Sequence, residues 1–539
     1  MTFVKLWFEL NIISLFKEIK LSYIPPLMVY MAAGISGLTS IVGTFYVKER
    51  LGLSAEFLAA LGFWAGLPWA LKMPVGHIID LIWRWKALLV YLGAALIATS
   101  LLIMILLLNN LEALTPFAEP ASWFVLSTIL APIGYVLQDV VADAMTVEAV
   151  PKVNSDGKEL SPKTKKLMHT TMQTLGRVAI IGGGIMVSLV NVLVMKGAEN
   201  FTELEKTQTY LLVYQLGLTI PLISILGVIF ASFLKQRYRN KLHLQGFSKS
   251  KINEILDREN IKPPNINWWI LGGGISFSLL SVSIGLGNLA MGQEIIFCLS
   301  MGIVVFLMQR IFNDLDFESR KILIGTALLI FIFRAMPTPG AGSTWWMIDE
   351  LKFDQQFLAK LSLIASVLAL FGMFIFRKFM AERSITYVIG FLTVAGTILS
   401  LPIIGMYFGL HEWTATVTNG VVDARFIAMI DTALESPLGQ VAMIPMLAWI
   451  ANSAPEHLKA TFFAIMASFV NLALSASQLG TKYLNQVFTI SREVRENNII
   501  LVEADYSELG LLLITVSLIG FLIPMATILL LRVSNLKNA

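Results

Sequence analysis

Three acidic residues lie near one another in a long apolar stretch of the chain. Asp139 and Asp143 are four residues apart, and Glu148 follows within the next two turns. If this stretch is an α-helix, the two aspartates share one face, because residues four apart are neighbours on a helix surface. A carboxylate at the centre of a bilayer costs about 3 kcal/mol or more, so such groups face a protein interior or a water-filled cavity. The cluster therefore predicts a polar pathway inside a membrane protein.

Three basic residues also occur within apolar segments. Lys72, Arg177 and Arg334 could neutralise the acids or bind an anionic solute, and Arg334 lies deep in its segment. Two carboxylates at close range repel each other, which favours retention of a proton on one of them. The acids therefore serve either proton coupling or substrate binding. Alternatively, Lys72 and Asp139 form a permanent pair between helices, and Arg177 extends to the membrane surface.

Four tryptophans accompany these charged residues. Trp64, Trp69, Trp345 and Trp346 could line a cavity, where a flat solute would stack on their rings. They could equally belong to the core or to the aromatic belt at the membrane surface.

Gly76, Asp80 and Arg84 form a candidate gating charge set. Their spacing resembles the signature G-x-x-x-D-x-x-G-R of the major facilitator superfamily, with Trp83 in place of the second glycine. Gly76 would allow close helix approach, and the two charges could bridge neighbouring helices in one conformation and separate in the other. The alternative is a static surface ion pair, which would contribute little to stability.

The composition indicates a membrane protein whose helices position these residues. Of 539 residues, 56% are hydrophobic and 14% are charged, whereas soluble domains carry about 25% charged residues. A membrane-spanning helix needs about 20 apolar residues. Fourteen such segments occur, at 22–46, 55–79, 87–108, 122–149, 169–195, 210–234, 268–289, 293–312, 321–346, 356–376, 385–408, 426–451, 459–487 and 508–532. We therefore predict an all-α polytopic membrane protein.

Several functional classes are disfavoured. The single cysteine, Cys298, excludes an internal disulfide framework, and the net charge of +4 does not suggest nucleic acid binding. No G-x-x-x-x-G-K-[ST] loop occurs, which argues against an ATP-driven pump. Because the five histidines are scattered, we expect no metal site, no cofactor and no enzymatic activity.

Lysine and arginine residues orient the predicted spans. They gather in alternate loops, above all in segment 235–266. The positive-inside rule then places both termini in the cytoplasm of a multi-pass protein of the cell (inner) membrane. Residues 1–21 carry apolar side chains at helical spacing and are expected to form an amphipathic helix on the cytoplasmic membrane surface.

The two halves of the chain share a signature. The Phe-Leu-Ala sequence at 57–59 recurs at 357–359, an offset of 300 residues. We expect a six-helix bundle at 22–234, a basic cytoplasmic linker at 235–266, two inserted helices at 267–320 and a second six-helix bundle at 321–539. Two six-helix bundles are typical of the major facilitator fold, in which a solute binds between the bundles and rocking alternates access.

The repeat also predicts a division of labour. Aligning Pro151 with Pro455 places uncharged residues opposite Asp139 and Asp143. We therefore expect the first bundle to carry ion coupling and the second to supply mainly apolar and aromatic contacts.

Longer motifs occur in three segments. They include Leu67-Pro68-Trp69 with the downstream Lys72 and Gly76, the acidic residues at 139–148, and a segment from 443 to 472. Together they resemble the folate–biopterin transporter family of the major facilitator superfamily. One departure is Lys459-Ala460, where that family's pattern has Glu-Gly. The acidic run, Pro151 and the two inserted helices also resemble the muropeptide permease family, the nearest alternative.

The resemblance implies proton-driven uptake or exchange of a pterin-like or other organic anion. Asp139 or Asp143 could hold the donor edge of a pterin through paired hydrogen bonds, and the anionic tail of a folate would need a cation. We expect a monomer whose partners are a small-molecule substrate, protons and the lipid bilayer. A muropeptide or peptide permease is the alternative transporter. A channel and an integral membrane enzyme are the alternatives from other functional classes.

Overall fold

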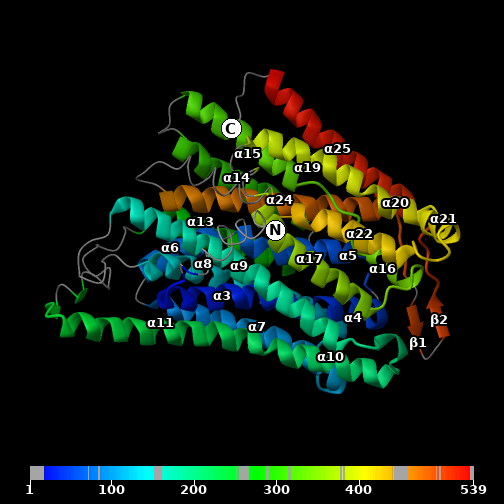
Figure 1. Ribbon diagram of the computed structural model, residues 1–539, viewed down its shortest axis with the longest axis horizontal. Helices are drawn as coiled ribbons and strands as arrows, with labels where there is room; N and C mark the ends of the chain where they lie inside the picture. Colours follow the sequence, from blue (N-terminus) through cyan, green and yellow to red (C-terminus); the bar gives the residue numbers. More distant parts are fainter. Residues whose placement is uncertain are drawn as a thin grey trace, which may run out of the picture.

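The structure is a computed structural model in which many of the long helices lie roughly along the longest axis of the molecule (Figure 1). It describes residues 17, 19–51, 53–70, 72–82, 85–150, 161–249, 252–253, 266, 268–286, 291–312, 317–376, 379, 383–439, 441, 459–492, 494–496 and 499–533.

The helices of the first half follow one another from α3 to α11. They are α3 (Ile24–Ile35), α4 (Ser40–Arg50), α5 (Ala55–Ala70), α6 (Lys72–Leu81), α7 (Ala87–Asn109), α8 (Pro120–Ala149), α9 (Pro162–Val194), α10 (Glu203–Gly217) and α11 (Thr219–Leu244). A 3₁₀ segment, η3 (Ser36–Thr39), separates α3 from α4.

Two inserted helices, α13 (Trp268–Leu286) and α14 (Gly292–Phe312), precede the second half. The helices of the second half are α15 (Phe317–Arg334), α16 (Ala341–Asp349), α17 (Gln355–Ile375), α19 (Ile385–Leu399), α20 (Leu401–Tyr407), α21 (Leu410–Val417), α22 (Ala424–Glu435), α24 (Lys459–Val487) and α25 (Leu509–Val533). Between α24 and α25, the short strands β1 (Val494–Glu496) and β2 (Ile499–Val502) form an antiparallel hairpin that the sequence analysis did not predict.

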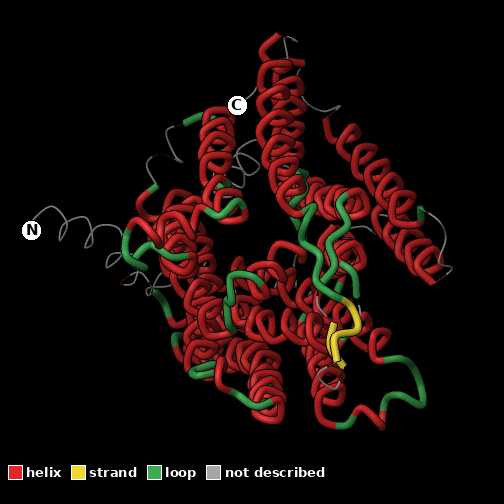
Figure 2. The backbone as a smooth tube through the Cα atoms, turned by 90° about the vertical axis from the view of Figure 1, so that its right-hand side faces the viewer, coloured by secondary structure: helices red, strands yellow, loops and turns green. Residues whose placement is uncertain are grey.

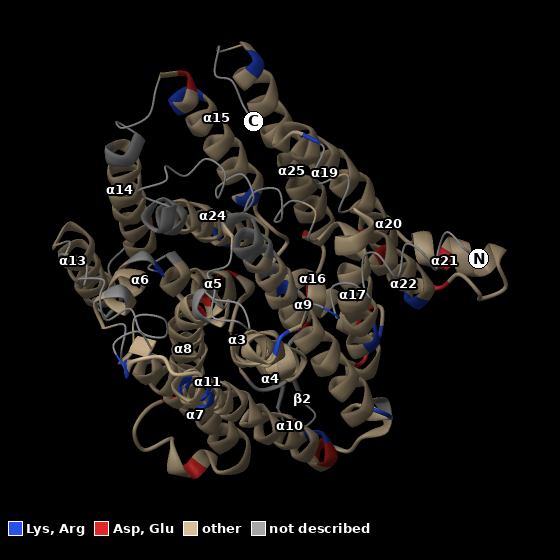
Figure 3. Cartoon of the chain, turned by 60° about the vertical axis from the view of Figure 1, so that its left-hand side comes forward, with Lys and Arg blue, Asp and Glu red and all other residues tan. Residues whose placement is uncertain are grey.

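The predicted all-α polytopic architecture is confirmed. Within the described residues, ten helical segments are long and apolar enough to cross a membrane. Helices also occupy parts of the other predicted ranges, but the count of fourteen spans remains a prediction. Figure 3 shows that the described lysine, arginine, aspartate and glutamate residues gather mainly near the ends of the helices. The few charges inside the bundle are therefore candidates for function.

Two helices differ from the predicted ranges. The helix predicted to end at 234 continues in α11 to Leu244, because the lysines and arginines that follow the apolar segment are good helix formers. The predicted span 321–346 is interrupted between α15 and α16. Pro337 and Pro339 cannot donate backbone hydrogen bonds, and Gly340 has a φ of 77°, which favours glycine. The predicted N-terminal amphipathic helix lies almost entirely outside the described residues.

The two halves meet along two helix pairs, α5 with α24 and α9 with α17. We call the end of the molecule that carries the β1–β2 hairpin and the C-terminal end of α4 the hairpin end; it lies at the right of Figure 1 and faces the viewer in Figure 2. There, Ala55 and Leu58 of the first half pack in one apolar cluster with Trp345 and Trp346 of the second. The halves are therefore closed against each other at the hairpin end.

Hydrogen bonds reinforce this closure. Gln486 Nε2 of α24 donates to Glu56 Oε1 of α5 at 2.6 Å. Gln355 Nε2, at the start of α17, donates to the hydroxyl oxygen of Tyr210 in α10 at 2.9 Å, and this pair is buried. Any motion that opens the hairpin end must break these bonds.

Two asparagines, 294 residues apart, make similar contacts in the two halves. Asn191 of α9 donates to the carbonyl oxygen of Leu38, in the 3₁₀ segment between α3 and α4, at 3.2 Å. Asn485 of α24 donates to the carbonyl oxygen of Pro339, in the interruption between α15 and α16, at 3.3 Å. Helices α5 and α17 begin 300 residues apart, the offset found in the sequence. Each half thus supports a break in its first helix with an amide from its fifth.

Helix α8, which carries Asp139 and Asp143, is held by a close glycine contact and a buried glutamine. A Cβ atom added to Gly93 of α7 would lie 2.5 Å from the carbonyl oxygen of Gly134, so the backbones approach closely only without side chains. Gln138 donates to the carbonyl oxygen of Val90 at 3.3 Å and accepts a hydrogen bond from Ser224 of α11 at 2.9 Å. These contacts fix the rotation of α8 and turn its aspartates away from α7.

The inserted helices lie beside the contact between α5 and α24. At the start of α14, Gln293 donates to the carbonyl oxygen of Ala60 in α5 at 3.1 Å. The adjacent Glu294 pairs with Lys482 of α24 at 2.9 Å and accepts a hydrogen bond from Tyr483 at 2.5 Å. Neighbouring residues of α14 thus bind both halves of the protein.

Candidate functional site

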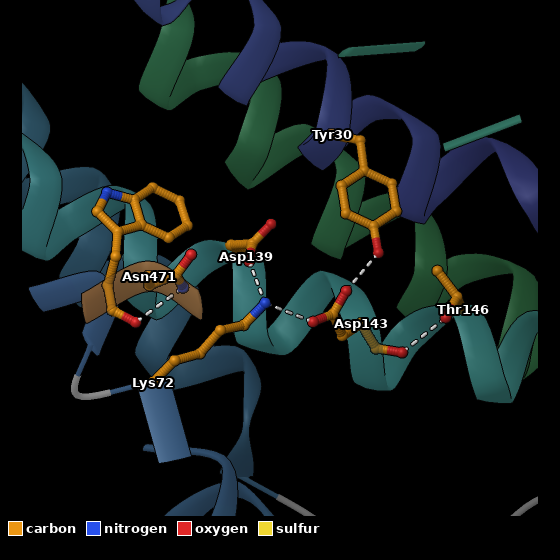
Figure 4. Close-up of polar contacts among 7 residues, drawn as sticks. Tyr30, Lys72, Asp139, Asp143, Thr146 and Asn471 are labelled. Carbon is orange, nitrogen blue, oxygen red and sulfur yellow. Dashed lines mark hydrogen bonds and ion pairs between the residues drawn. The ribbon is translucent and has the colours of Figure 1, made fainter. Parts of the chain in front are cut away.

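Lys72 lies between the two aspartates of α8 (Figure 4). Its Nζ atom is 2.5 Å from Asp139 Oδ2 and 2.8 Å from Asp143 Oδ2. The hydroxyl of Tyr30 in α3 donates to Asp143 Oδ1 at 2.6 Å. The structure therefore brings together three residues that the sequence singled out and adds Tyr30, which the sequence analysis missed. We call these four residues the acidic cluster.

Local structure explains how the cluster is assembled. The aspartates lie one turn apart on α8, and Thr146 donates its hydroxyl to the carbonyl oxygen of Asp143 at 2.7 Å in the following turn. Lys72 is the first residue of α6. Just before it, the carbonyl oxygen of Trp69 accepts a hydrogen bond from Asn471 of α24 at 3.1 Å, so the second half contacts the edge of the cluster (Figure 4).

The two aspartates differ in exposure. The side chain of Asp143 is 43% exposed, whereas those of Asp139 and Lys72 are 15% and 20% exposed. A buried ion pair whose partners satisfy each other is a structural unit, whereas an accessible carboxylate can exchange a proton or bind a solute. Asp139 and Lys72 therefore form the enclosed part of the cluster, and Asp143 its accessible part.

The predicted arginines continue the charged region toward the second half. Arg177 of α9 is near enough to act electrostatically on Asp139 and Tyr30. It also acts on Arg334, the last residue of α15. Arg177 therefore lies near charged groups of both halves.

The predicted cavity tryptophans lie in packed surroundings. Trp64 makes an edge contact with Phe63, with ring centroids 5.7 Å apart. Trp69 packs against the apolar residues around the acidic cluster. Trp345 and Trp346 are buried in the apolar cluster at the hairpin end. A role in solute binding remains a prediction for all four.

Other predicted residues are only partly visible. Arg84 and the side chains of Asp80 and Glu148 lie outside the described residues. Gly76 faces α8, because a Cβ atom there would lie 3.9 Å from a methyl group of Val140. The gating role of Gly76, Asp80 and Arg84 remains a prediction. Where side chains are described, no group of three or more His, Cys, Asp or Glu residues is arranged to hold a metal ion.

Sequence reasoning missed Arg492, which joins the halves at the hairpin end. It is 4% exposed, and its Nη1 atom donates to the carbonyl oxygen of Val47 in the last turn of α4 at 2.5 Å. Its guanidinium lies over the ring of Trp345 at 5.2 Å. Burial lowers the pKa of Arg492, while the nearby Tyr506 and Asp349 raise it. Arginine nonetheless stays protonated, so the contact places a permanent positive charge at a helix C-terminus, where it is favourable.

Known proteins resemble this chain in sequence and in fold. A folate-biopterin transporter from Synechocystis sp. is 25% identical over 154 residues, which cover 29% of this chain and 30% of that protein. Folate transporter 2 from Plasmodium falciparum is 25% identical over 179 residues, which cover 32% of this chain and 37% of that protein. The aligned segments thus span about a third of these relatives' lengths.

A solved structure resembles the fold over nearly its whole length. A POT peptide transporter in complex with alafosfalin superposes with a TM-score of 0.61 at 12% sequence identity, covering 96% of this chain and 95% of that one. At this identity the likeness concerns the fold alone, and it confirms the predicted major facilitator fold. A sequence profile of the BT1 family matches residues 33–538, from within α3 to beyond α25. This protein is therefore a member of the BT1 family.

Proposed function

We propose that this protein is a secondary active transporter that moves a folate- or pterin-like organic anion across the cytoplasmic membrane by alternating access. Three features support the proposal: the membrane-length helices, the two halves that meet along two helix pairs, and the charged residues inside the bundle. The relatives described above carry names that refer to folate and biopterin. Substrate, direction and coupling ion belong to the proposal.

The observation that carries this proposal is the exposure of Asp143. Its side chain is 43% exposed although it lies in a helix that is long and apolar enough to cross the membrane. The donor edge of a pterin presents two neighbouring N–H groups, which match the two oxygens of a carboxylate. Lys72 and Tyr30 each hold one oxygen of Asp143, so a solute would compete with them or share their partner.

The same geometry suggests how a proton would be coupled to transport. Tyr30, Lys72 and Asp139 surround Asp143, and Arg177 lies near the cluster. A proton on Asp143 would remove one of the two negative charges that hold Lys72 in place. Protonation would therefore loosen the link between α6 and α8, and deprotonation would restore it. A charge pair that switches in this way can bias one conformation over the other.

The test is uptake into proteoliposomes under an imposed pH gradient. We expect saturable uptake of folate or biopterin that rises with the inward proton gradient in the wild type and no longer responds to it in Asp143→Asn. Glu112→Gln changes an exposed acid in the short 3₁₀ segment Leu111–Ala113; it is the matched control and should behave as the wild type. Gradient-driven uptake that persists in Asp143→Asn would refute the coupling role.

A ligand screen tests the substrate class separately. Folates, pterins, muropeptides and peptides would be added to purified protein, and the melting temperature would be measured. We expect protection by folates or pterins, and less protection of Asp143→Asn. Protection by muropeptides but not by pterins would instead favour the alternative permease function.

A further inference from the structure

The interruption between α15 and α16 places an arginine at a helix break inside a predicted membrane span. Arg334 is the last residue of α15, and residues 335–340 separate it from the start of α16. Helices broken at membrane depth often form solute sites, because the ends of the half-helices carry partial charges and the chain there faces a cavity or other protein. The position of Arg334 therefore calls for a functional explanation.

Side chains of α24 hydrogen-bond several backbone groups of the interruption without this arginine. Thr481 of α24 accepts a hydrogen bond from the backbone N–H of Thr338 at 2.9 Å, and Ser477 donates to the carbonyl oxygen of Met336 at 2.6 Å. With Asn485, these side chains form one face of α24 at four-residue spacing. Because α24 supplies these contacts, the hydrogen bonding of the break does not require Arg334, although its charge is favourable at the C-terminus of α15.

The guanidinium of Arg334 has no hydrogen-bond acceptor or carboxylate partner in the part of the chain that the structure describes. Its Nε atom is buried and makes no hydrogen bond. The charged group that acts on it is Arg177, another cation, from the opposite half. The C-terminus of α15 offsets about half of the charge of Arg334, and a partly buried charge without a full counter-ion is unfavourable. Two arginines that approach each other in a membrane protein therefore create a position at which an anion is stabilised.

The balance of charges agrees with this interpretation. The acidic cluster contains two carboxylates and Lys72, and the arginines add two cations. Among the described side chains, these three cations and two carboxylates leave one net positive charge. Lys72 and the two carboxylates together carry one negative charge, so the two cations Arg177 and Arg334 exceed it by one. These two residues come from α9 and α15, so an anion between them would contact both halves.

We propose that Arg177 and Arg334 form an anion subsite that holds the carboxylate tail of the solute while Asp143 holds its ring. This inference rests on the proposed function and names the specificity of the same site. Folate and biopterin share a pterin ring, but only folate carries a glutamate tail. Arginine binds a carboxylate through two parallel hydrogen bonds, which lysine cannot reproduce. The subsite therefore distinguishes solutes with an anionic tail from neutral ones.

The test compares three probes on purified wild-type protein and on Arg334→Gln. The probes are folate, biopterin and p-aminobenzoylglutamate, which carries the anionic tail without a pterin ring. We expect Arg334→Gln to weaken folate binding by about 10- to 100-fold, the range for a lost charge-assisted hydrogen bond. Biopterin binding should change less than about twofold, and binding of p-aminobenzoylglutamate should be lost.

Arg320→Gln, near the start of the same helix, is the matched control and should leave all three probes unaffected. If Arg334→Gln does not yield monodisperse protein, Arg334→Lys replaces it, with a smaller loss expected for folate and again no change for biopterin. Equal losses for folate and biopterin, or no loss for either, would overturn the subsite, as would a wild type that binds none of the probes. If the ringless anion binds in an Arg334-dependent manner while both pterins fail, the subsite stands and the pterin proposal falls.

Discussion

Replacing Arg492 should open the hairpin end. The contact from its Nη1 atom to the carbonyl oxygen of Val47 links the second half to the C-terminal turn of α4. Its stacking on Trp345 lies within the second half and does not hold the halves together. Only the hydrogen bond to Val47 therefore contributes to the free energy that keeps the hairpin end closed. A hydrogen bond to a charged group contributes about 1.5–3 kcal/mol, so we take about 2 kcal/mol for Arg492→Ala.

This value predicts a measurable shift in population. Because 1.4 kcal/mol corresponds to a factor of ten, the ratio of closed to open molecules should fall by about 30-fold. A protein that is almost entirely closed would then show a clear open fraction. Since opening of this end is part of the proposed transport cycle, the variant should also change the apparent affinity for solute added from that side.

Distances between spin labels would measure the shift. After Cys298→Ser, labels at Leu111 of the first half and Val421 of the second would sit at exposed positions. Arg492→Ala should broaden the distance distribution toward longer values. Identical distributions in folded Arg492→Ala and in the wild type would refute the reasoning.

Arg425→Ala is the matched control for this measurement. Arg425 also lies at the hairpin end, pairs with Asp354 at 2.9 Å and lies over the ring of Phe357 at 5.3 Å. Both partners belong to the second half. Its removal should lower stability without changing the distance between the halves.

Two further predictions concern packing. Gly93→Val should destabilise the protein by about 3 kcal/mol or more, because the added side chain would collide with the backbone of α8. Gly182→Val, where no atom lies within 4 Å of the added Cβ, should have a much smaller effect on the melting temperature. Glu294→Gln should weaken the pairing of α14 with Lys482, and we expect a loss of about 2 kcal/mol as a lower melting temperature. Glu203→Gln, in an exposed ion pair, should change it little; equal effects of the two glutamate variants would contradict a bracing role for α14.

Much of the architecture could be predicted from the sequence. Long apolar segments cannot remain in water, and a bilayer requires them to form helices, so the polytopic all-α fold follows from composition and spacing. The acidic pair was predicted for the same local reason, since helix geometry alone places Asp139 and Asp143 on one face. The 300-residue offset agrees with the starts of α5 and α17.

Other features depended on tertiary packing. The sequence offered Lys72 as a partner of Asp139, but its bridge to Asp143 depends on the depth and rotation at which α6 meets α8. Tyr30 reaches the same carboxylate from a helix more than a hundred residues away in the chain. In the sequence, Arg492 is one of two arginines in a short polar stretch, and only the packed halves give it a helix terminus to bind.

The sequence by itself thus determined which residues share a helix face and which segments enter the membrane, because both follow from spacing along one helix. The tertiary structure alone decided which charges meet, which are left without a described partner, and which end of the molecule is closed. Those outcomes depend on the relative position and rotation of separate helices. Close backbone contacts such as that of Gly93 with α8 set these positions, and their effect cannot be read from either helix alone.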